Sequence, residues 1–397
     1  MEWLYSLSQD ELYNYKEKQF LRIFRKAYRH STFYSQLYRK HGIAESDIKS
    51  LSDIAKLPVL TKDIVKQHGK DMLTVPEVFV SRADTSGTTG TPLTAYLSYK
   101  AIRLEQAFNW CRRKNSGFIY GKDRLLSLRG HLGAKRFRAY VSVSNTLYLS
   151  AEQITDELAV KYFEEIGNFK PIAIEGYPST LYNLALSLDR NDLKLTIPKA
   201  FTSSETLFPF QRKVIERVFG TELFDRYGCT ERCISFSEQI DHLGYYEDPG
   251  YGHTEIFVDH VLATSLINDA FPLIRYRVND VLIKGSDGYI ESIEGRTEDV
   301  IVCKDGAKIS RLNNVLKGVS GIAFVQIVQK VKGEIEVRYV PDSDFSSNSI
   351  TQIENGLHDK IEKSNIDIAF IEVDEDRIIY TSRNKFSFVK SYLDSFA

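Results

Sequence analysis

The chain has 397 residues, of which 43% are hydrophobic and 26% are charged, and its formal net charge is -1. This composition is typical of a folded globular protein, and the length favours two domains. The balanced charge argues against a nucleic-acid-binding or anionic-membrane protein, which usually carries a basic excess. No apolar run has the length of a membrane span and the first residues lack a signal-peptide pattern, so we expect a cytoplasmic protein without an integral membrane segment.

The four cysteines are too few and too scattered to form a disulfide framework. Cys229 and Cys233 lack further ligands at a spacing that would suit structural zinc, so we expect no zinc site.

The first elements are helical. Ser8 and Glu11 form a capping box that predicts a helix, with Phe20, Phe24 and Ala27 on its apolar face. A second helix is expected from about Ser31 to Gly42. Residues 78–80 and 93–98 then predict two strands with a polar loop between them.

That loop, residues 85–93, holds four threonines, one serine and two glycines and ends in Pro-Leu. The hydroxyls and the bare N–H groups near Gly87 and Gly90 could surround phosphate oxygens. A Walker loop is excluded because no lysine follows the second glycine. On composition alone, a flexible surface linker explains the loop equally well.

The middle of the chain alternates strands and helices, which predicts an α/β fold with mixed sheets. A capping box at Ser150 and Gln153 predicts a helix that ends near Gly167, and Gly220 ends another helix. The basic loop at residues 129–138, which contains His131, is either a solvated loop or a site for an anionic acceptor. The remaining segments are a helix at 101–116, strands at 125–128, 172–176 and 199–203, and short strands over 254–290.

The pattern changes after Arg296. A hairpin with its turn at Lys304-Asp305-Gly306 is expected first. A helix, two strands, a helix and a strand follow, at 311–317, 322–330, 334–340, 348–363 and 368–373. This order predicts a small α+β domain of about 100 residues.

The loop at 85–93 resembles the phosphate-binding loop of the adenylate-forming enzymes. The motif Leu57-Pro58-Val59-Leu60-Thr61-Lys62 is similar to the corresponding motif of the phenylacetate–CoA ligase branch and of its relatives encoded with capsular polysaccharide genes. Many adenylate-forming enzymes have a lysine where this chain has Leu93. The resemblance covers about Leu57 to Val389 and implies a large domain of mixed sheets flanked by helices, residues 1–297, and a mobile C-terminal domain, residues 298–397.

Four further segments carry the resemblance. Residues 227–231 match Tyr-Gly-x-Thr-Glu, 275–280 match Tyr-Arg-Thr-Gly-Asp with Asn279 in place of glycine, 295–299 match Gly-Arg-x-x-Asp, and 382–386 match the Ser-Gly-Lys motif with Asn384 in place of glycine. Residues 203–205 resemble the segment that lies beside the adenine.

The resemblance implies a role for each matched position. Tyr227 offers its ring to a purine, Asp280 accepts the ribose hydroxyls, Arg296 approaches the ribose or phosphate, and Glu298 occupies the hinge position. The implied catalytic residues are Lys385, Glu231 and Thr230, with Glu231 also holding Mg²⁺. The other implied nucleotide-binding residues are Thr85, Ser86, Gly87, Thr88, Thr89, Gly90, Ser204, Glu205, Asp225 and Gly228.

The sequence therefore predicts an ATP- and Mg²⁺-dependent ligase that forms an acyl-adenylate from a carboxylic acid and releases pyrophosphate. The acyl group would pass to an amine or a sugar in cell-surface polysaccharide biosynthesis. One alternative is a phenylacetate–CoA ligase-like enzyme that uses the thiol of CoA as the acceptor. A second alternative, from another class, is a nucleotide-binding module without catalysis. The sequence indicates neither the acid nor the oligomeric state.

Overall fold

A computed structural model describes residues 1–84, 93–128, 132, 136–151, 154–294, 300–310, 312–316, 318–380 and 386–393. The chain forms two compact units, each built from two stretches of sequence. Unit 1 comprises Met1–Tyr120 and Arg226–Ile293, and unit 2 comprises Gly121–Asp225 and Glu294–Ala397. The sequence predicts a mobile C-terminal domain that begins at residue 298, and this boundary stays a prediction.

Unit 1 begins with helices. Ser8 caps the first helix through the predicted capping box, and Gly42 follows the second helix with a left-handed φ of 68°. The α-helices of unit 1 are α1 (Gln9–His30), α2 (Thr32–Lys40), α3 (Lys62–His68) and α4 (Tyr99–Asn115). Its short 3-10 helices are Glu2–Ser6, Glu45–Asp47, Leu51–Lys56, Glu77–Phe79 and Ser286–Gly288.

The strands of unit 1 form a hairpin, a three-stranded sheet and part of a larger sheet. The hairpin pairs β1 (Val80–Asp84) with β2 (Thr94–Ser98), and the small sheet has the order β11-β12-β13. In the larger sheet the order is β14-β15-β10-β9-β8. These strands are β8 (Glu222–Gly228), β9 (Ser235–Glu238), β10 (Tyr245–Glu247), β11 (Gly252–Ile256), β12 (Val261–Ser265), β13 (Tyr276–Val278), β14 (Val281–Lys284) and β15 (Ile290–Glu294).

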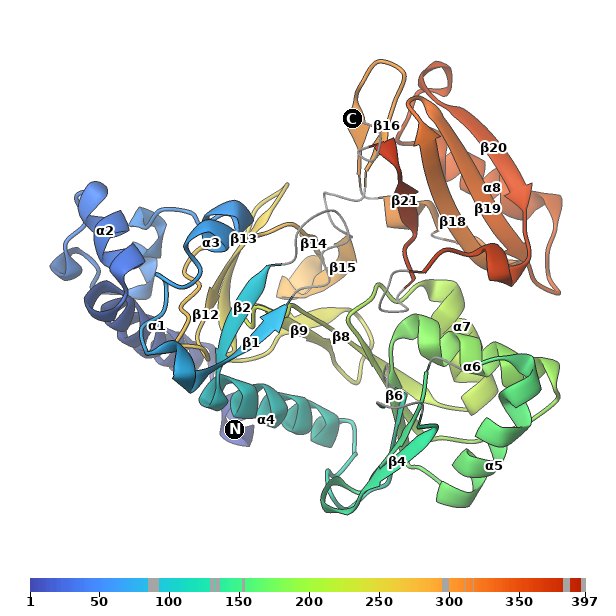
Figure 1. Ribbon diagram of the computed structural model, residues 1–397, viewed down its shortest axis with the longest axis horizontal. Helices are drawn as coiled ribbons and strands as arrows, with labels where there is room; N and C mark the ends of the chain where they lie inside the picture. Colours follow the sequence, from blue (N-terminus) through green and yellow to red (C-terminus); the bar gives the residue numbers. More distant parts are fainter. Residues whose placement is uncertain are drawn as a thin grey trace. The chain divides into compact units, whose positions relative to one another are not determined.

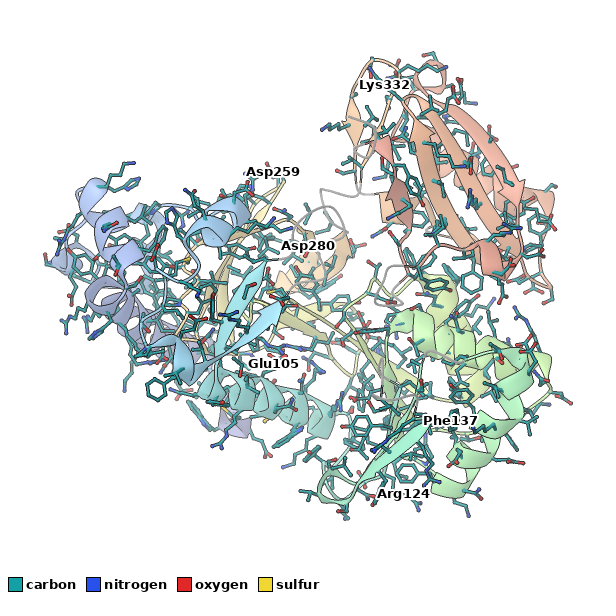
Figure 2. The ribbon with its side chains drawn as sticks, viewed as in Figure 1. Glu105, Arg124, Phe137, Asp259, Asp280 and Lys332 are labelled. Carbon is teal, nitrogen blue, oxygen red and sulfur yellow. The ribbon has the colours of Figure 1, made fainter. Side chains whose placement is uncertain are left out.

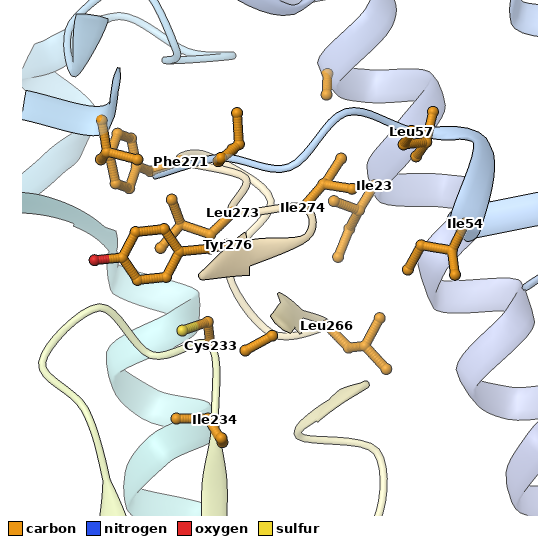
Figure 3. Close-up of a cluster of buried hydrophobic side chains, with 14 of the residues drawn as sticks. Ile23, Ile54, Leu57, Cys233, Ile234, Leu266, Phe271, Leu273, Ile274 and Tyr276 are labelled. Atoms are coloured by element: carbon orange, nitrogen blue, oxygen red, sulfur yellow. The ribbon is translucent and has the colours of Figure 1, made fainter. Parts of the chain in front are cut away.

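The largest core of unit 1 lies between α1–α3 and the β12–β13 region (Figure 1). Phe20, Ile23 and Phe24 of α1 are fully buried in it, as the helical spacing of these residues predicts. Figure 3 shows part of this core, with Ile23, Leu273, Cys233 and Tyr276 among its labelled side chains. The site residues at 227–231 and 276–280 therefore project from a packed scaffold.

Unit 2 contains a mostly parallel sheet. Strand β8 begins in this unit, and the order continues β7-β6-β3-β5-β4, with only the β4–β5 pair antiparallel among these five strands. The strands are β3 (Leu125–Leu128), β4 (Arg138–Val141), β5 (Thr146–Leu149), β6 (Ala173–Gly176) and β7 (Lys199–Ser203). The helices are α5 (Ala159–Phe169), α6 (Pro178–Arg190) and α7 (Pro209–Phe219), with 3-10 helices at Ser142–Ser144 and Asp156–Leu158. Parallel strands joined by helices confirm the predicted α/β class.

The C-terminal part of unit 2 is a four-stranded sheet with the order β20-β19-β18-β21, preceded by a short hairpin. Tyr182 of α6 donates a hydrogen bond to the carbonyl of Ala323 at 2.7 Å, so this sheet packs against α6 (Figure 1). The elements are β16 (Ile301–Val302), β17 (Lys308–Ile309), β18 (Ile322–Val331), β19 (Glu334–Pro341), α8 (Ser347–His358), β20 (Asp367–Glu372) and β21 (Val389–Ser391), with 3-10 helices at Leu312–Leu316, Lys363–Asn365 and Glu375–Arg377.

Three sequence expectations were wrong in detail. The helix expected after Ser150 begins only at Ala159 and continues through Gly167, because a capping sequence does not by itself nucleate a helix. Residues 77–79 form a 3-10 turn ahead of β1 in place of a strand. The helix expected at 311–317 is a 3-10 helix over Leu312–Leu316.

None of the helices built from the described residues combines the length and the apolar character that crossing a bilayer requires.

Gln326, a fully buried residue of β18, binds both ends of a segment that lies 53 to 61 positions later in the chain. Its Nε2 donates to the carbonyls of Ile379 and Ser387 at 2.8 and 2.7 Å. Its Oε1 accepts the backbone N–H of Ile379 at 2.9 Å. The two ends of the 380–386 segment are therefore held together by one side chain, and Tyr380 and Phe386 add an antiparallel bridge.

Replacement of Gln326 by alanine should release the two ends of this segment, at Ile379 and Ser387, from each other. The half-buried backbone groups of Ile379 and Ser387 would lose their partner, at a cost of about 1–3 kcal/mol in the free energy of unfolding. Hydrogen exchange should show faster exchange at the Ile379 amide.

Gln329 is the matched control, because it is equally buried on the same strand but bonds to both backbone groups of Val302. Gln329→Ala should accelerate exchange at Val302 and leave Ile379 protected. Equal protection of Ile379 in both variants would contradict the anchoring role of Gln326.

Candidate active site

Many of the site residues expected from the sequence lie outside the described residues. They are Thr85, Ser86, Gly87, Thr88, Thr89, Gly90, His131, Arg296, Glu298 and Lys385. The structure does describe the elements that flank the phosphate loop and the matched segments at 203–205, 225–231 and 276–280.

The candidate phosphate loop follows β1 and precedes β2 in the chain, and these two strands are paired. Asp84 at the end of β1 is opposite Thr94 at the start of β2, and the Thr94 hydroxyl donates to the Asp84 carboxylate at 2.7 Å. Leu93, which replaces the lysine of many family members, is only 1% exposed and belongs to the unit 1 core. A buried leucine anchors the loop end in a way that a charged lysine could not.

Two tyrosine–carboxylate hydrogen bonds join the segments 227–231 and 276–280 within unit 1. The hydroxyl of Tyr227 donates to Oδ2 of Asp280 at 2.5 Å. In the opposite direction, the hydroxyl of Tyr276 donates to Oε1 of Glu231 at 3.3 Å. Each segment therefore supplies one phenol and one carboxylate, and residues that are about 50 positions apart in the sequence are brought together.

Both phenols remain protonated at neutral pH. The pKa of Tyr227 lies well above its usual range because its hydroxyl is withdrawn from water and faces the Asp280 carboxylate. Burial, followed by the charge of Glu231, likewise raises the pKa of Tyr276. Two neutral donors thus fix the orientation of two carboxylates, of which Asp280 is half-buried and Glu231 is 9% exposed.

A tight turn carries Glu231. The N–H of Arg232 donates to the carbonyl of Cys229 at 3.2 Å, and Arg232 has a left-handed φ of 59°. Such a φ is uncommon outside glycine and requires support from the surroundings. The hydroxyl of Ser265 gives that support by donating to the Arg232 carbonyl at 2.7 Å. The turn also holds half-buried Thr230 beside Glu231.

The cysteines on either side of this turn are free thiols. The Sγ atoms of Cys229 and Cys233 are 3.4 Å apart, and Cys233 is buried in the unit 1 core. Burial raises the pKa of the Cys233 thiol well above its usual value. These thiols therefore pack as apolar side chains beside the turn.

The remaining described candidates lie in unit 2. Ser204 is exposed and has a left-handed φ of 74°, which turns the chain at the end of β7. Oε2 of Glu205 accepts the N–H of Ser179 in the first turn of α6 at 3.2 Å, a favourable place for a carboxylate. Asp225 is 5% exposed and accepts a hydrogen bond from Thr202 at 2.5 Å. Asp225 and Tyr227 are two residues apart on β8 and so point to the same face of that strand.

The residues present fit a magnesium ion that is shared with a polyphosphate. Glu231 and Thr230 supply hard oxygen donors, and Mg²⁺ is commonly held by one or two carboxylates together with substrate phosphates. The described residues contain no group of three or more histidine, cysteine, aspartate or glutamate side chains placed to hold a metal. Glu231 would therefore hold the ion jointly with the nucleotide.

Sequence reasoning missed the buried polar residues that support the turn. Glu105 of α4 is 3% exposed and accepts hydrogen bonds from Arg226 and Arg232, the neighbours of the 227–231 segment (Figure 2 labels Glu105 and Asp280). A glutamate in an ordinary helical segment gives no sign of such a role. The pair of arginines that brackets the motif was the one available signal.

Known proteins resemble this chain over most of its length. No family model matches the chain. The chain is 24% identical to Protein CapK of Staphylococcus aureus over 372 residues, which cover 86% of this chain and 78% of CapK. It is 26% identical to a phenylacetate–coenzyme A ligase of Escherichia coli, with 75% and 74% of the two chains covered. It is 24% identical to the indoleacetate–lysine synthetase of Pseudomonas savastanoi, with 69% and 73% covered.

The fold is also that of a solved ligase. A crystal structure of 2-hydroxyisobutyryl-CoA ligase in complex with an adenylate aligns with a TM-score of 0.73 and 16% identity, over 98% of this chain and 94% of that one. The segments at 227–231 and 276–280 meet in the structure, and the similarity to relatives spans most of the sequence. Over most of its length the chain is therefore similar to adenylate-forming, ATP-dependent ligases.

Proposed function

We propose that this protein joins a carboxylic acid to the α-phosphate of ATP, releases pyrophosphate and passes the acyl group to an acceptor in cell-surface polysaccharide assembly. The observation that carries the proposal is the pair of hydrogen bonds Tyr227–Asp280 and Tyr276–Glu231. They hold a carboxylate for ribose and a carboxylate for a metal on one scaffold within unit 1.

The nucleoside would be held by the half-buried pair. The Asp280 carboxylate accepts the two ribose hydroxyls, because two oxygens can receive a cis diol. The Tyr227 ring offers an apolar face to the purine while its hydroxyl keeps Asp280 oriented. Ser204 would lie beside the adenine, and Arg296 would approach the ribose or phosphate.

Two of the candidate acids act in support of this site. Glu205 stabilises the first turn of α6, and Asp225 is bound to Thr202 in the interior of unit 2. Their contribution is to hold the ends of β7 and β8, from which Ser204 and Tyr227 extend.

The phosphates would be bound by the loop Thr85–Gly90 and by Glu231 with Thr230 through Mg²⁺. Mg²⁺, when bound, neutralises charge on the phosphate oxygens. A carboxylate oxygen of the acid forms a bond to the α-phosphorus, and the bond from that phosphorus to the bridging oxygen of the β-phosphate breaks. Lys385 stabilises the charge that develops there, so the reaction needs positioning and electrostatics without a protein nucleophile.

The C-terminal domain, residues 298–397, would bring Lys385 to the nucleotide by rotation about Glu298. Gln326 binds Ile379 and Ser387, which lie on either side of the segment that contains Lys385. These bonds would limit the positions that the lysine can adopt. Rotation of one domain about a few hinge residues is a common way to separate two half-reactions.

An amine acceptor is favoured by one relative. The name of indoleacetate–lysine synthetase describes the joining of an acid to an amine. The similarity to phenylacetate–coenzyme A ligases supports CoA as the alternative acceptor. The products differ, because a thiol gives a thioester, an amine gives an amide and a hydroxyl gives an ester.

Acid-dependent exchange of labelled pyrophosphate into ATP tests the proposal directly. With a panel of aryl and acyl acids, at least one acid should support exchange, and Lys385→Ala should reduce the rate by about 100-fold or more because a charge at the α-phosphate is lost. ATP binding without exchange for any acid would favour the non-catalytic nucleotide-binding module.

Replacement of Asp280 by asparagine tests the ribose contact. Loss of a hydrogen bond to a charged group should weaken ATP binding by about 1.5–3 kcal/mol, or roughly 10- to 150-fold, as measured by calorimetry. Tyr227→Phe is the control, since it removes the phenol that donates to Asp280 but keeps the ring, and should weaken ATP binding less. An unchanged ATP affinity in folded Asp280→Asn would rule out the ribose role.

Replacement of Glu231 by glutamine tests the metal role. The shape is kept while the charge is lost, so the rate of pyrophosphate exchange should fall at least tenfold and recover in part at raised Mg²⁺ concentration. Full activity at ordinary Mg²⁺ concentration would show that Glu231 has only a structural role.

A further inference from the structure

Glu105 is the centre of a buried network in unit 1. Its Oε1 accepts hydrogen bonds from Nη1 of Arg226 at 2.7 Å and from Nη1 of Arg232 at 2.6 Å. Its Oε2 accepts a short hydrogen bond from the hydroxyl of Tyr251. Three donors from different parts of the chain thus converge on one carboxylate of α4.

The two arginines are the immediate neighbours of the segment 227–231. Arg226 precedes Tyr227, and Arg232 follows Glu231. One carboxylate oxygen therefore binds both ends of the segment that carries the proposed purine and metal contacts. The distance between those ends is set by two hydrogen bonds to the same atom.

Hydrogen bonds to Ser235, in addition to the one to Glu105, fix the side chain of Arg226. Its Nε and Nη2 donate to the Ser235 hydroxyl at 3.0 and 2.8 Å, and Ser235 in turn bonds to Asp248. A Cβ on Gly228 would lie 3.3 Å from Nη2 of Arg226, which is tighter than ordinary packing. The glycine of the motif thus leaves the room that the Arg226 guanidinium occupies.

The arginines beside Glu105 keep its carboxylate ionised at neutral pH. Burial alone would raise the pKa of Glu105, but the charges of Arg226 and Arg232 outweigh it and lower the pKa to about 2. Removal of Glu105 would leave the buried cation of Arg226 and the partly buried cation of Arg232 without this carboxylate partner.

We propose that Glu105 is a positioning residue for the 227–231 segment, which it holds through Arg226 and Arg232 so that Glu231 and Tyr227 meet the metal and the nucleotide. The inference rests on the proposed function. Its physical basis is that Arg232 follows Glu231 directly and has a left-handed backbone, so a shift of Arg232 moves the Glu231 carboxylate. Small displacements of a catalytic group cause large losses of rate.

Arg232 is the residue to change. The side chain of Arg232 is 29% exposed. If this side chain is removed, Glu105 keeps Arg226 and Tyr251 as hydrogen-bond partners. Among the described residues its Nε has no hydrogen-bond partner, so Nη1 makes the contact with Glu105. A lysine can replace a single contact of that kind.

Arg212→Ala is the matched control. Arg212 of α7 has a similar exposure of 24% and also donates from Nη1 to a glutamate, Glu216, and to the carbonyl of Leu223. It has no place in the proposed site, so its loss should cause a comparable change in melting temperature without an effect on the proposed reaction.

The test measures pyrophosphate exchange by the full-length protein as a function of Mg²⁺ concentration. Arg232→Ala should lower kcat at least tenfold and raise the Mg²⁺ concentration for half-maximal activity severalfold, with little change in KM for the acid. Arg232→Lys should restore most of the activity, and Arg212→Ala should match the unaltered protein.

Two results would overturn the positioning role. One is an unchanged kcat and Mg²⁺ requirement in Arg232→Ala. The other is a loss of activity that follows the loss of thermal stability with no change in Mg²⁺ requirement, which a purely structural role predicts.

Failure of the proposed function gives a different result. In that case the unaltered protein supports no exchange with any acid, and hydrogen exchange of the amides at 229–231 becomes the measurement. Faster exchange there in Arg232→Ala, but not in Arg212→Ala, supports the positioning role, and equal exchange in both overturns it.

Discussion

A carboxylate that is removed from water must be balanced by cations and donors within hydrogen-bonding distance. Glu105 meets this requirement with Arg226, Arg232 and Tyr251, all in unit 1. Because the two arginines bracket residues 227–231, the requirement of one buried charge also constrains the path of the candidate site segment. The hydroxyl of Tyr227 then donates a hydrogen bond to Asp280 and so orients its carboxylate.

The same principle recurs with a neutral side chain in unit 2. Gln326 is fully buried and must satisfy both its donor and its acceptor groups, which it does on the backbone at Ile379 and Ser387. In both units a buried polar side chain holds the two ends of a segment that carries proposed active-site residues.

Much of the fold could be predicted because local signals agree with tertiary structure. The capping box at Ser8, the glycine at Gly220 after α7 and the turn at Gly306 between β16 and β17 were all placed correctly. The helix expected after Ser150 was misplaced, because a capping sequence needs an apolar face to dock, and that face begins only at Ala159. The 3-10 turn at residues 77–79 shows the same limit in a short apolar run.

The sequence by itself determined the α/β class and the resemblance to adenylate-forming enzymes, because motif spacing and the pattern of apolar residues can be read along the chain. Only the tertiary structure decided which partners those residues have. Tyr276 with Glu231, Tyr227 with Asp280 and Glu105 with Arg232 are separated by 45, 53 and 127 positions, so no local pattern pairs them. Burial in a common core, and the need to satisfy each buried polar atom, selected those pairs.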